Sequence, residues 1–290
     1  MTRQRLFGTV GVFLFTIACS LSGLIPATPT PADQVGTLVA TTMQALTVVP
    51  SEIASTPMSG TPVSFENVSL VIPNGLAGGA NPEKMMTVDA NSGAPWEIAP
   101  MHLRFNLTEY TLQGKFHEPR IFVYPADEYA QTNPIAAEQI DNIKKILAGS
   151  TILKETLPRV PWFNAELLIA ASIQLIPFQN GRGVRTLTQY AQYAAPINNH
   201  ELFYHFEGLT SDGRYYLIAI LPMTAPILPE DEKPEASVPA GGVSIPTDIG
   251  IGNTYYSSVT EKLNSLAPDA YTPSLATLDS LIQSVQVTSP

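Results

Sequence analysis

The four histidines are the side chains best suited to metal binding or proton transfer, and their spacing separates them. His200 and His205 are five positions apart on a predicted strand, so they should point to opposite faces of a sheet. His102 and His117 lie on neighbouring predicted strands and could meet across a hairpin. Because the chain has 1 cysteine and no HExxH motif, we expect no metal site and no cofactor.

Pairs of carboxylates, which could act as acid and base, occur in segments typical of solvated loops. Asp127 and Glu128 follow a proline, and Asp231 and Glu232 lie in a proline-rich stretch. Glycoside hydrolysis needs two carboxyl groups roughly 5–10 Å apart across a cleft, one of them with a raised pKa. The sequence also lacks a GxSxG nucleophile elbow. We therefore predict no catalytic residue, and an exported hydrolase of cell-wall or extracellular polymer remains the alternative.

Tyrosine, asparagine and histidine gather between positions 189 and 216 and form the candidate ligand surface. On one face of a sheet, such side chains can stack on a sugar or peptide and hydrogen-bond to it. The alternative is that tyrosine is frequent here because it favours strands. Asn198 and Asn199 should lie in a loop between two hairpins, where functional polar groups often occur. The predicted surface consists of Tyr190, Tyr193, Asn198, Asn199, His200 and Tyr204.

The sequence Asn180-Gly181-Arg182-Gly183 has the glycine content of a phosphate-binding loop but not its context. A phosphate loop leads into the N-terminus of a helix, whereas a strand pattern follows here. We predict a hairpin turn whose glycines adopt positive φ angles.

Periodicity and turn signals predict the elements that would position these residues. Asn180-Gly181 and Ser211-Asp212-Gly213 each divide two strand patterns and indicate two hairpins. Tyr215–Leu221 is apolar throughout, which is typical of a strand buried on both faces. In the first hairpin strand, alternation predicts one shared face for Leu167, Ile169, Ala171, Ile173 and Leu175. Strands are expected at 68–72, 101–110, 116–124, 167–179, 184–193, 200–209, 214–221 and 285–287.

Three helices are predicted from apolar spacing and capping residues. The first follows Asn133 as cap and Pro134 in the first turn, and ends before Gly149. The others span 254–266 and 273–283, with Asn253 and Thr272 as caps. Residues 222–252, with six prolines, should form a long surface loop. The resulting fold class is α+β, an antiparallel sheet of five to seven strands with helices packed on it.

Composition limits the classes of function. Hydrophobic residues make up 44% of the 290 positions, enough for a sizeable core. The net charge of −10 argues against nucleic-acid binding, which needs a positive surface.

The N-terminus predicts export. Arg3 and Arg5 precede an uncharged run, Leu6 to Ala18, whose thirteen residues suit a signal peptide better than a membrane span. The chain's only cysteine, Cys19, ends this run and resembles the lipidated residue of a bacterial lipobox, although Thr16 stands where leucine is usual. An ordinary signal cut near Ala18 or Gly23, or an uncleaved membrane anchor, are the alternatives.

The predicted domains follow from this pattern. Residues 1–18 form a signal peptide, and 19–62 form a lipidated N-terminus and a disordered linker rich in Pro, Thr and Ala, with a short helix in it. Residues 63–290 form a single α+β domain. We expect the protein to be held on the outer side of the bacterial cytoplasmic membrane or at the cell surface.

One segment carries a family resemblance. The sequence NGRGVRTLTQYAQ at 180–192, PINN at 196–199 and YxFxGLTxDGxYY at 204–216 resemble a group of exported bacterial proteins over about residues 110–225. The strand order and the ending Leu278-x-x-Leu281-Ile282-x-Ser284-Val285 are more loosely similar to PsbP-like domains, an α/β/α sandwich. The PsbP-like resemblance implies non-catalytic binding or assembly work in an envelope compartment.

Together these features predict a cell-envelope lipoprotein that binds a ligand or partner without catalysis. Its expected partners are the membrane, through the lipid anchor, and an unknown small molecule, glycan or protein, with no nucleic acid. The alternatives are the hydrolase named above and an assembly factor for a membrane complex.

Overall fold

The computed structural model describes residues 59–91, 93–161, 163–249 and 254–288. These residues belong to one compact unit, residues 56–290. The predicted signal peptide, Cys19 and the linker up to residue 58 lie outside the described residues.

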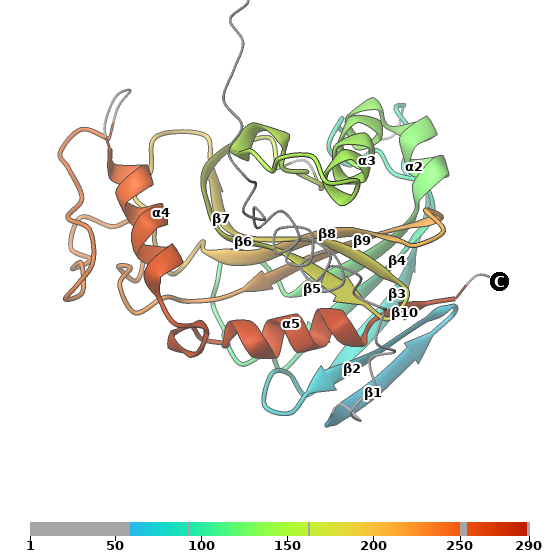
Figure 1. The fold of residues 1–290 in the computed structure, drawn as a ribbon, viewed down its shortest axis with the longest axis horizontal. Coiled ribbons are helices and arrows are strands. Elements are labelled where there is room, and N and C mark those ends of the chain that lie inside the picture. The colour runs from blue at the N-terminus through green and yellow to red at the C-terminus, as the bar shows by residue number, and fades with distance from the viewer. Residues whose placement is uncertain (1–58, 92, 162, 250–253, 289–290) are drawn as a thin grey trace, which may run out of the picture. The chain divides into compact units, whose positions relative to one another are not determined.

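A seven-stranded antiparallel sheet forms the centre of the unit, in the order β3-β4-β5-β9-β8-β7-β6 (Figure 1). The two predicted hairpins are confirmed as β6–β7 and β8–β9. The α+β class with antiparallel sheets is therefore confirmed. The strands are β3 (Gly79–Met85), β4 (His102–Thr108), β5 (Arg120–Pro125), β6 (Glu166–Phe178), β7 (Gly181–Ala191), β8 (Phe203–Thr210) and β9 (Tyr215–Pro222).

A second sheet of three strands has the order β1-β2-β10, where the sequence predicted one sheet only. It contains β1 (Gly60–Phe65), β2 (Val68–Pro73) and β10 (Gln286–Val287). Since β1 begins at Gly60, the last three positions of the predicted linker belong to a strand. The predicted final strand is confirmed as β10, which pairs with the start of β2.

The described part of the chain contains four α-helices, which pack against the sheets. Figure 1 shows α2 (Ala126–Thr132) and α3 (Pro134–Leu147) on one face, and α5 (Leu275–Ser284) with the small sheet on the other. Helix α4 (Tyr255–Ser265) packs along the edge strand β6. Short 3₁₀ turns occupy Lys154–Thr156 and Pro268–Ala270. No helix in the described part of the chain combines the length and the apolar character needed to cross a bilayer.

The caps explain where two helices begin. The Asn133 side chain accepts hydrogen bonds from the backbone N–H of Ile135 at 2.9 Å and of Ala136 at 3.3 Å, which confirms the predicted cap of α3. The cap of α5 is Ser274, not the predicted Thr272. Thr272 instead exchanges backbone hydrogen bonds with Thr224. Asn253 lies outside the described residues.

Strand β9 separates two hydrophobic cores. Leu217, Ala219 and Leu221 face α5 and the small sheet, while the residues between them face α2 and α3. This two-sided burial confirms the prediction drawn from the apolar run.

The predicted shared face of β6 holds only for Ile169 and Ala171. Leu167 packs in the other core, because the pairing with β7 is already irregular between Leu167 and Ile169. The pairing of β6 with β7 is irregular between Ala171 and Gln174, and Ser172 has a φ of 49°. An irregularity of this kind reverses the inward and outward alternation that follows it. Ile173 and Leu175 are consequently exposed, and Ile176 and Phe178 are buried instead.

Glycine is required at positions 181 and 183 of the first hairpin for a different reason from the predicted one. Neither Gly181 nor Gly183 has a positive φ angle. A Cβ atom on Gly183 would lie 2.3 Å from the carbonyl oxygen of Glu207 on the neighbouring strand. Close approach of β7 and β8, not left-handed backbone, therefore requires glycine here.

Prolines in the described strands lie either in edge strands or at the last position of an inner strand. Pro62 in β1, Pro82 in β3 and Pro177 in β6 all lie in edge strands. In the inner strands β2, β5 and β9, proline is found only as the last residue. This distribution follows from the missing N–H group, which an inner strand would need for pairing.

Candidate functional site

The structure does not bring the six predicted ligand residues to one surface. Tyr190 packs in the core beneath α2 and α3, whereas Tyr204 packs in the core on the α5 side. The Tyr204 hydroxyl donates a hydrogen bond to Asp279 at 2.9 Å, and Arg185 binds the same carboxylate at 2.6 Å. Both tyrosines are buried, so the prediction of a shared exposed face is corrected for them.

The two asparagines serve the loop itself. Asn198 accepts hydrogen bonds from the backbone N–H groups of His200 and Glu201 at 2.9 and 3.1 Å. The Asn199 side chain accepts from the N–H of Ala225 at 2.8 Å and donates to two carbonyls of the proline-rich segment. Since both side chains are buried and engaged, they hold the loop in place and do not face a ligand.

Tyr193 and His200 are the accessible members of the predicted set. Tyr193 is 60% exposed, and its hydroxyl donates to the Glu232 carboxylate. This hydrogen bond raises the pKa of Tyr193 to about 12. His200 is partly exposed and its Nδ1 lies 3.1 Å from the carbonyl oxygen of Gly114. Tyr193 therefore connects the predicted region to the proline-rich loop.

The proline-rich loop encloses a groove beside Tyr193, which we call the loop groove. Its volume is about 880 Å³. Proline and aliphatic side chains form much of its wall, and hydroxyl and charged groups are interspersed. Glu232, which binds Tyr193, is one of the lining residues. The groove is lined by Ala194, Pro196, Glu232, Lys233, Pro234, Ala236, Val238, Ser244, Ile245, Pro246, Thr247, Asp248 and Ile249.

The chemistry of the loop groove suits binding more than bond cleavage. No histidine or cysteine lines it. Of its charged groups, Glu232 accepts the Tyr193 hydroxyl and Lys233 binds Asp231 at 2.6 Å. Apolar walls with a few polar groups are typical of ligand sites, in which the apolar contacts provide affinity and the polar groups fix orientation.

A buried carboxylate, Glu207, is the group that most resembles a catalytic acid. One carboxylate oxygen accepts the backbone N–H of Val160 at 2.9 Å, and the other accepts the Tyr216 hydroxyl. His205 Nε2 lies 3.3 Å from the first oxygen and 3.0 Å from the Val160 carbonyl. We call these four residues the Glu207 cluster.

Burial determines the charge state of the Glu207 cluster. Desolvation raises the pKa of Glu207 to about 8 and lowers that of His205 to about 4. Both groups are therefore uncharged at neutral pH. Their side chains are each 1% exposed, so no substrate reaches them in this structure. Through Val160, the cluster joins the segment that follows α3 to strand β8 of the sheet by hydrogen bonds.

The sequence holds a signal for this cluster in the spacing of His205 and Glu207. Residues 205 and 207 are two apart on a strand, so they share a face, unlike the pair His200 and His205. A carboxylate and an imidazole on one face of a buried strand already indicate an interacting pair.

The other two histidines do not meet each other. His102 stacks on Tyr124 with ring centroids 4.3 Å apart. His117 precedes β5 and packs on Phe203 at 4.2 Å, where burial lowers its pKa to about 4. Within the described ranges, no three His, Cys, Asp or Glu residues gather as metal ligands.

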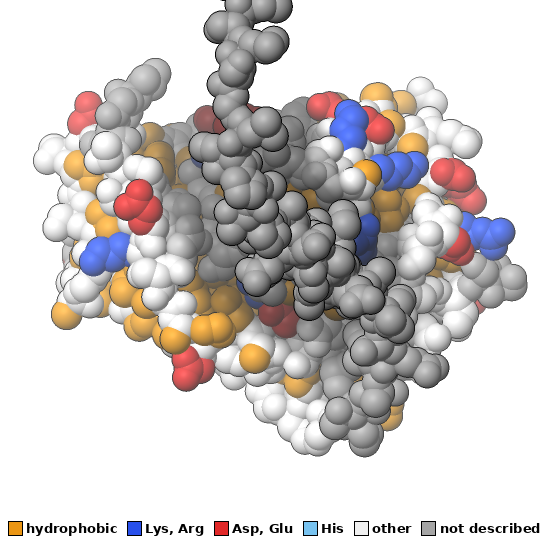
Figure 2. Space-filling model, in the orientation of Figure 1, with side chains coloured by type: hydrophobic (Ala, Val, Ile, Leu, Met, Phe, Trp, Pro, Cys, Tyr) orange, Lys and Arg blue, Asp and Glu red, His pale blue; other side chains and the backbone are white. Residues whose placement is uncertain are grey.

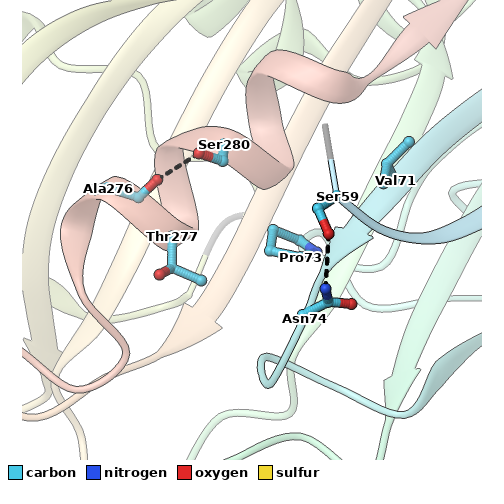
Figure 3. Close-up of a pocket in the computed structure, with 7 residues that line it drawn as sticks. All are labelled: Ser59, Val71, Pro73, Asn74, Ala276, Thr277 and Ser280. Carbon is cyan, nitrogen blue, oxygen red and sulfur yellow. Dashed lines mark hydrogen bonds between the residues drawn. The ribbon is translucent and has the colours of Figure 1, made fainter. Parts of the chain in front are cut away.

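A smaller hollow of about 260 Å³ lies between β2 and α5 (Figure 3). Its polar groups are neutral and mostly satisfied within the protein. Asn74 donates to the Ser59 hydroxyl at 2.8 Å, and Ser280 donates to the Ala276 carbonyl at 2.7 Å. We therefore place the candidate site at the loop groove.

Comparison with known proteins adds no assignment to this geometry. No protein-family model matches the chain, and a search of the curated proteins gave no match. The function of the loop groove therefore has to be inferred from its own residues.

Proposed function

We propose that this chain is a non-catalytic binding module of the cell envelope, exported and lipid-anchored through Cys19, with its ligand in the loop groove. The observation that carries the proposal is the groove itself. Its volume of about 880 Å³ falls within the roughly 300–1,000 Å³ typical of small-molecule sites. Tyr193 stands at its border with most of its ring exposed.

The same geometry disfavours the hydrolase alternative. A hydrolase needs a carboxyl or imidazole with a perturbed pKa that substrate can reach. Three described carboxylates have a raised pKa, and none of them lines the loop groove. Glu207 is buried with its oxygens engaged, Asp279 is paired with Arg185, and Glu201 accepts a hydrogen bond from Gln189.

The test is native mass spectrometry of the full chain, purified under mild conditions. We expect a reproducible adduct of defined mass that disappears in Ala194→Trp, which places a large ring in the groove. Ala276→Trp is the matched control, because Ala276 is also exposed but lines the hollow between β2 and α5. A bare chain mass, or equal loss in both variants, would contradict binding in the loop groove.

The anchor has a separate test. Cys19→Ser should release the full chain from the membrane fraction, since the cysteine thiol is the attachment point for the acyl chains. A chain that stays in the membrane fraction would instead favour the uncleaved anchor.

An assembly role is the second candidate, favoured by exposed apolar residues between β3 and β4. The ladder ends with Met85 opposite His102, so the next residues, Met86 and Met101, lie at the same end of the strands. They are 74% and 43% exposed. Exposed apolar side chains of this kind are found in protein-binding patches. Co-purification of a defined membrane complex that is lost in Met86→Ser but kept in Ala194→Trp would favour this role over the first.

A further inference from the structure

A second hollow lies where the C-terminal end of α3 meets the turns of both hairpins. It is distinct from the loop groove and shares no lining residue with it. Its volume is about 480 Å³. The lining residues are Lys144, Leu147, Gly181, Arg182, Leu209, Thr210, Ser211 and Gly213.

The two cations that line this hollow have no carboxylate partner among the described residues. Eight other lysine and arginine side chains of the described part of the chain lie within 4.0 Å of a carboxylate. Lys144 and Arg182 are two of the five that do not, with Lys154, Arg159 and Lys262, in a chain whose net charge is −10. Among the coloured residues in the view of Figure 2, Lys and Arg side chains lie beside Asp and Glu over α2 and α3 and form no broad basic area. The positive charge of the hollow is therefore a local feature.

Neighbouring acids are occupied by other partners. Asp141 binds Lys145 at 2.6 Å. Asp212 accepts the Thr210 hydroxyl at 2.6 Å and the backbone N–H of Arg214 at 3.1 Å, within its own turn. Lys144 and Arg182 can therefore act on an incoming anion without first breaking an ion pair.

Arg182 is also held in position. Its Nη2 donates to the carbonyl oxygen of Leu147, the last residue of α3. Carbonyls at the end of a helix carry partial negative charge, which disfavours a nearby anion. Because Arg182 satisfies this carbonyl, it offsets that charge and leaves its other guanidinium N–H groups available.

The floor of the hollow admits a compact group. Leu147 and the buried Leu209 provide an apolar base. Gly181 must be glycine, because a Cβ atom there would lie 2.4 Å from the Leu209 carbonyl oxygen. At Gly213, φ is +72° and nothing lies within 4 Å of a Cβ position, so the rim stays open.

We propose that this hollow binds a phosphate group, with Lys144 and Arg182 as its two cationic contacts and the Ser211 hydroxyl as a hydrogen-bond donor. Arginine presents several N–H donors in a fixed plane that matches phosphate oxygens, and lysine adds a point charge. The phosphate belongs either to a soluble phosphorylated molecule or to a phospholipid headgroup. This site is independent of the loop groove and of the ligand proposed there.

The experiment is a calorimetric titration of the full chain at low ionic strength with two probes. Inorganic pyrophosphate represents soluble phosphates, and glycerophosphoglycerol represents the diester headgroup of phosphatidylglycerol. We expect saturable binding that Lys144→Gln and Arg182→Gln each weaken at least about tenfold, as loss of a charged hydrogen-bond partner does. The probe that binds more tightly identifies the source of the phosphate.

Two controls separate a site from general charge. Lys262→Gln removes the same charge from an exposed lysine that forms no ion pair among the described residues and does not line the hollow, so binding should change by less than about twofold. Ser211→Asp keeps both cations and adds a negative charge, which should abolish binding without removing a contact of the fold. Absence of saturable binding for both probes, or equal weakening by Lys262→Gln, would overturn the proposal.

Discussion

Two carboxyl groups on opposite faces of the large sheet, the buried Glu207 and the half-buried Asp279, are stabilised in different ways. On the α2/α3 side, Glu207 has no cationic partner among the described residues and burial raises its pKa to about 8, so it keeps its proton. On the α5 side, burial also raises the pKa of Asp279, but the Arg185 guanidinium opposes that shift at a distance of 2.6 Å. The charge of the carboxyl group is therefore removed by a proton on one face and balanced by an arginine on the other. The difference predicts that pH and single substitutions affect the two faces unequally.

The largest effect is expected on the ion-pair face. Arg185→Met leaves the Asp279 charge without its partner and also removes hydrogen bonds to Ser172 and Gln174. Breaking a buried pair in this way costs about 3–5 kcal/mol of unfolding free energy. Urea denaturation monitored by circular dichroism measures the loss.

The control for this prediction is Lys145→Met. Lys145 and Asp141 form an exposed pair at the same distance of 2.6 Å. Exposed pairs contribute less than about 1 kcal/mol. If both substitutions lower the unfolding free energy by the same amount, the pair of Arg185 and Asp279 is not what stabilises the α5 face.

An intermediate effect is expected from pH on the other face. In the folded protein Glu207 titrates near pH 8, whereas an unfolded chain loses this proton near its ordinary pKa of 4.5. Between these values the folded state binds the extra proton, so the contribution of Glu207 to the free energy of unfolding decreases as pH rises through this window. Glu207→Gln cannot ionise and should flatten the decrease.

The measurement is the unfolding free energy of wild type and Glu207→Gln at pH 5, 6, 7 and 8. The wild type should lose stability relative to the variant with each step upward. Lys145→Met should show the same slope as the wild type, because this exposed residue pairs with Asp141 and does not contact Glu207. Parallel curves for wild type and Glu207→Gln would show that Glu207 is ionised in the folded protein.

The smallest effect is expected from Tyr204→Phe. This change removes the hydroxyl that donates to Asp279 but leaves the carboxylate paired with Arg185. The loss should be about 1–2 kcal/mol, the range for a hydrogen bond to a charged or neutral group. Thermal unfolding with a matched Tyr271→Phe variant checks it, because Tyr271 donates to a neutral carbonyl, that of Leu263. A larger loss in Tyr271→Phe would contradict the importance of the Asp279 contact.

Local signals in the sequence predicted the elements that local interactions determine. Asn133 and Pro134 predicted the start of α3, and the two turn sequences predicted both hairpins. The existence of a second sheet could not be predicted, since β2 pairs with β10 more than 200 positions away. Strand β3 could not be predicted either, because it contains Pro82 and few apolar residues.

The candidate site was predicted less well, for a physical reason. Tyr204 is buried because its hydroxyl finds Asp279, which lies 75 positions later in the chain. Asn198 and Asn199 are buried because backbone groups of two loops satisfy them. Sequence alone identifies a polar side chain in a loop, but not whether its partner is solvent, a ligand or the protein's own backbone. Tyr193 is the residue of the predicted surface that contacts the loop groove, through its hydrogen bond to Glu232.

The prolines in β1, β3 and β6 have a consequence for how copies of this chain behave together. An open strand edge is a template on which a second chain can add its own strand, and repeated addition produces fibrils. Pro62, Pro82 and Pro177 each remove an N–H group from such an edge. These three edges are therefore poorer templates for strand addition than unbroken strands would be. Under the proposed lipid anchor, which would concentrate copies in two dimensions, we expect this to slow strand pairing between neighbouring molecules.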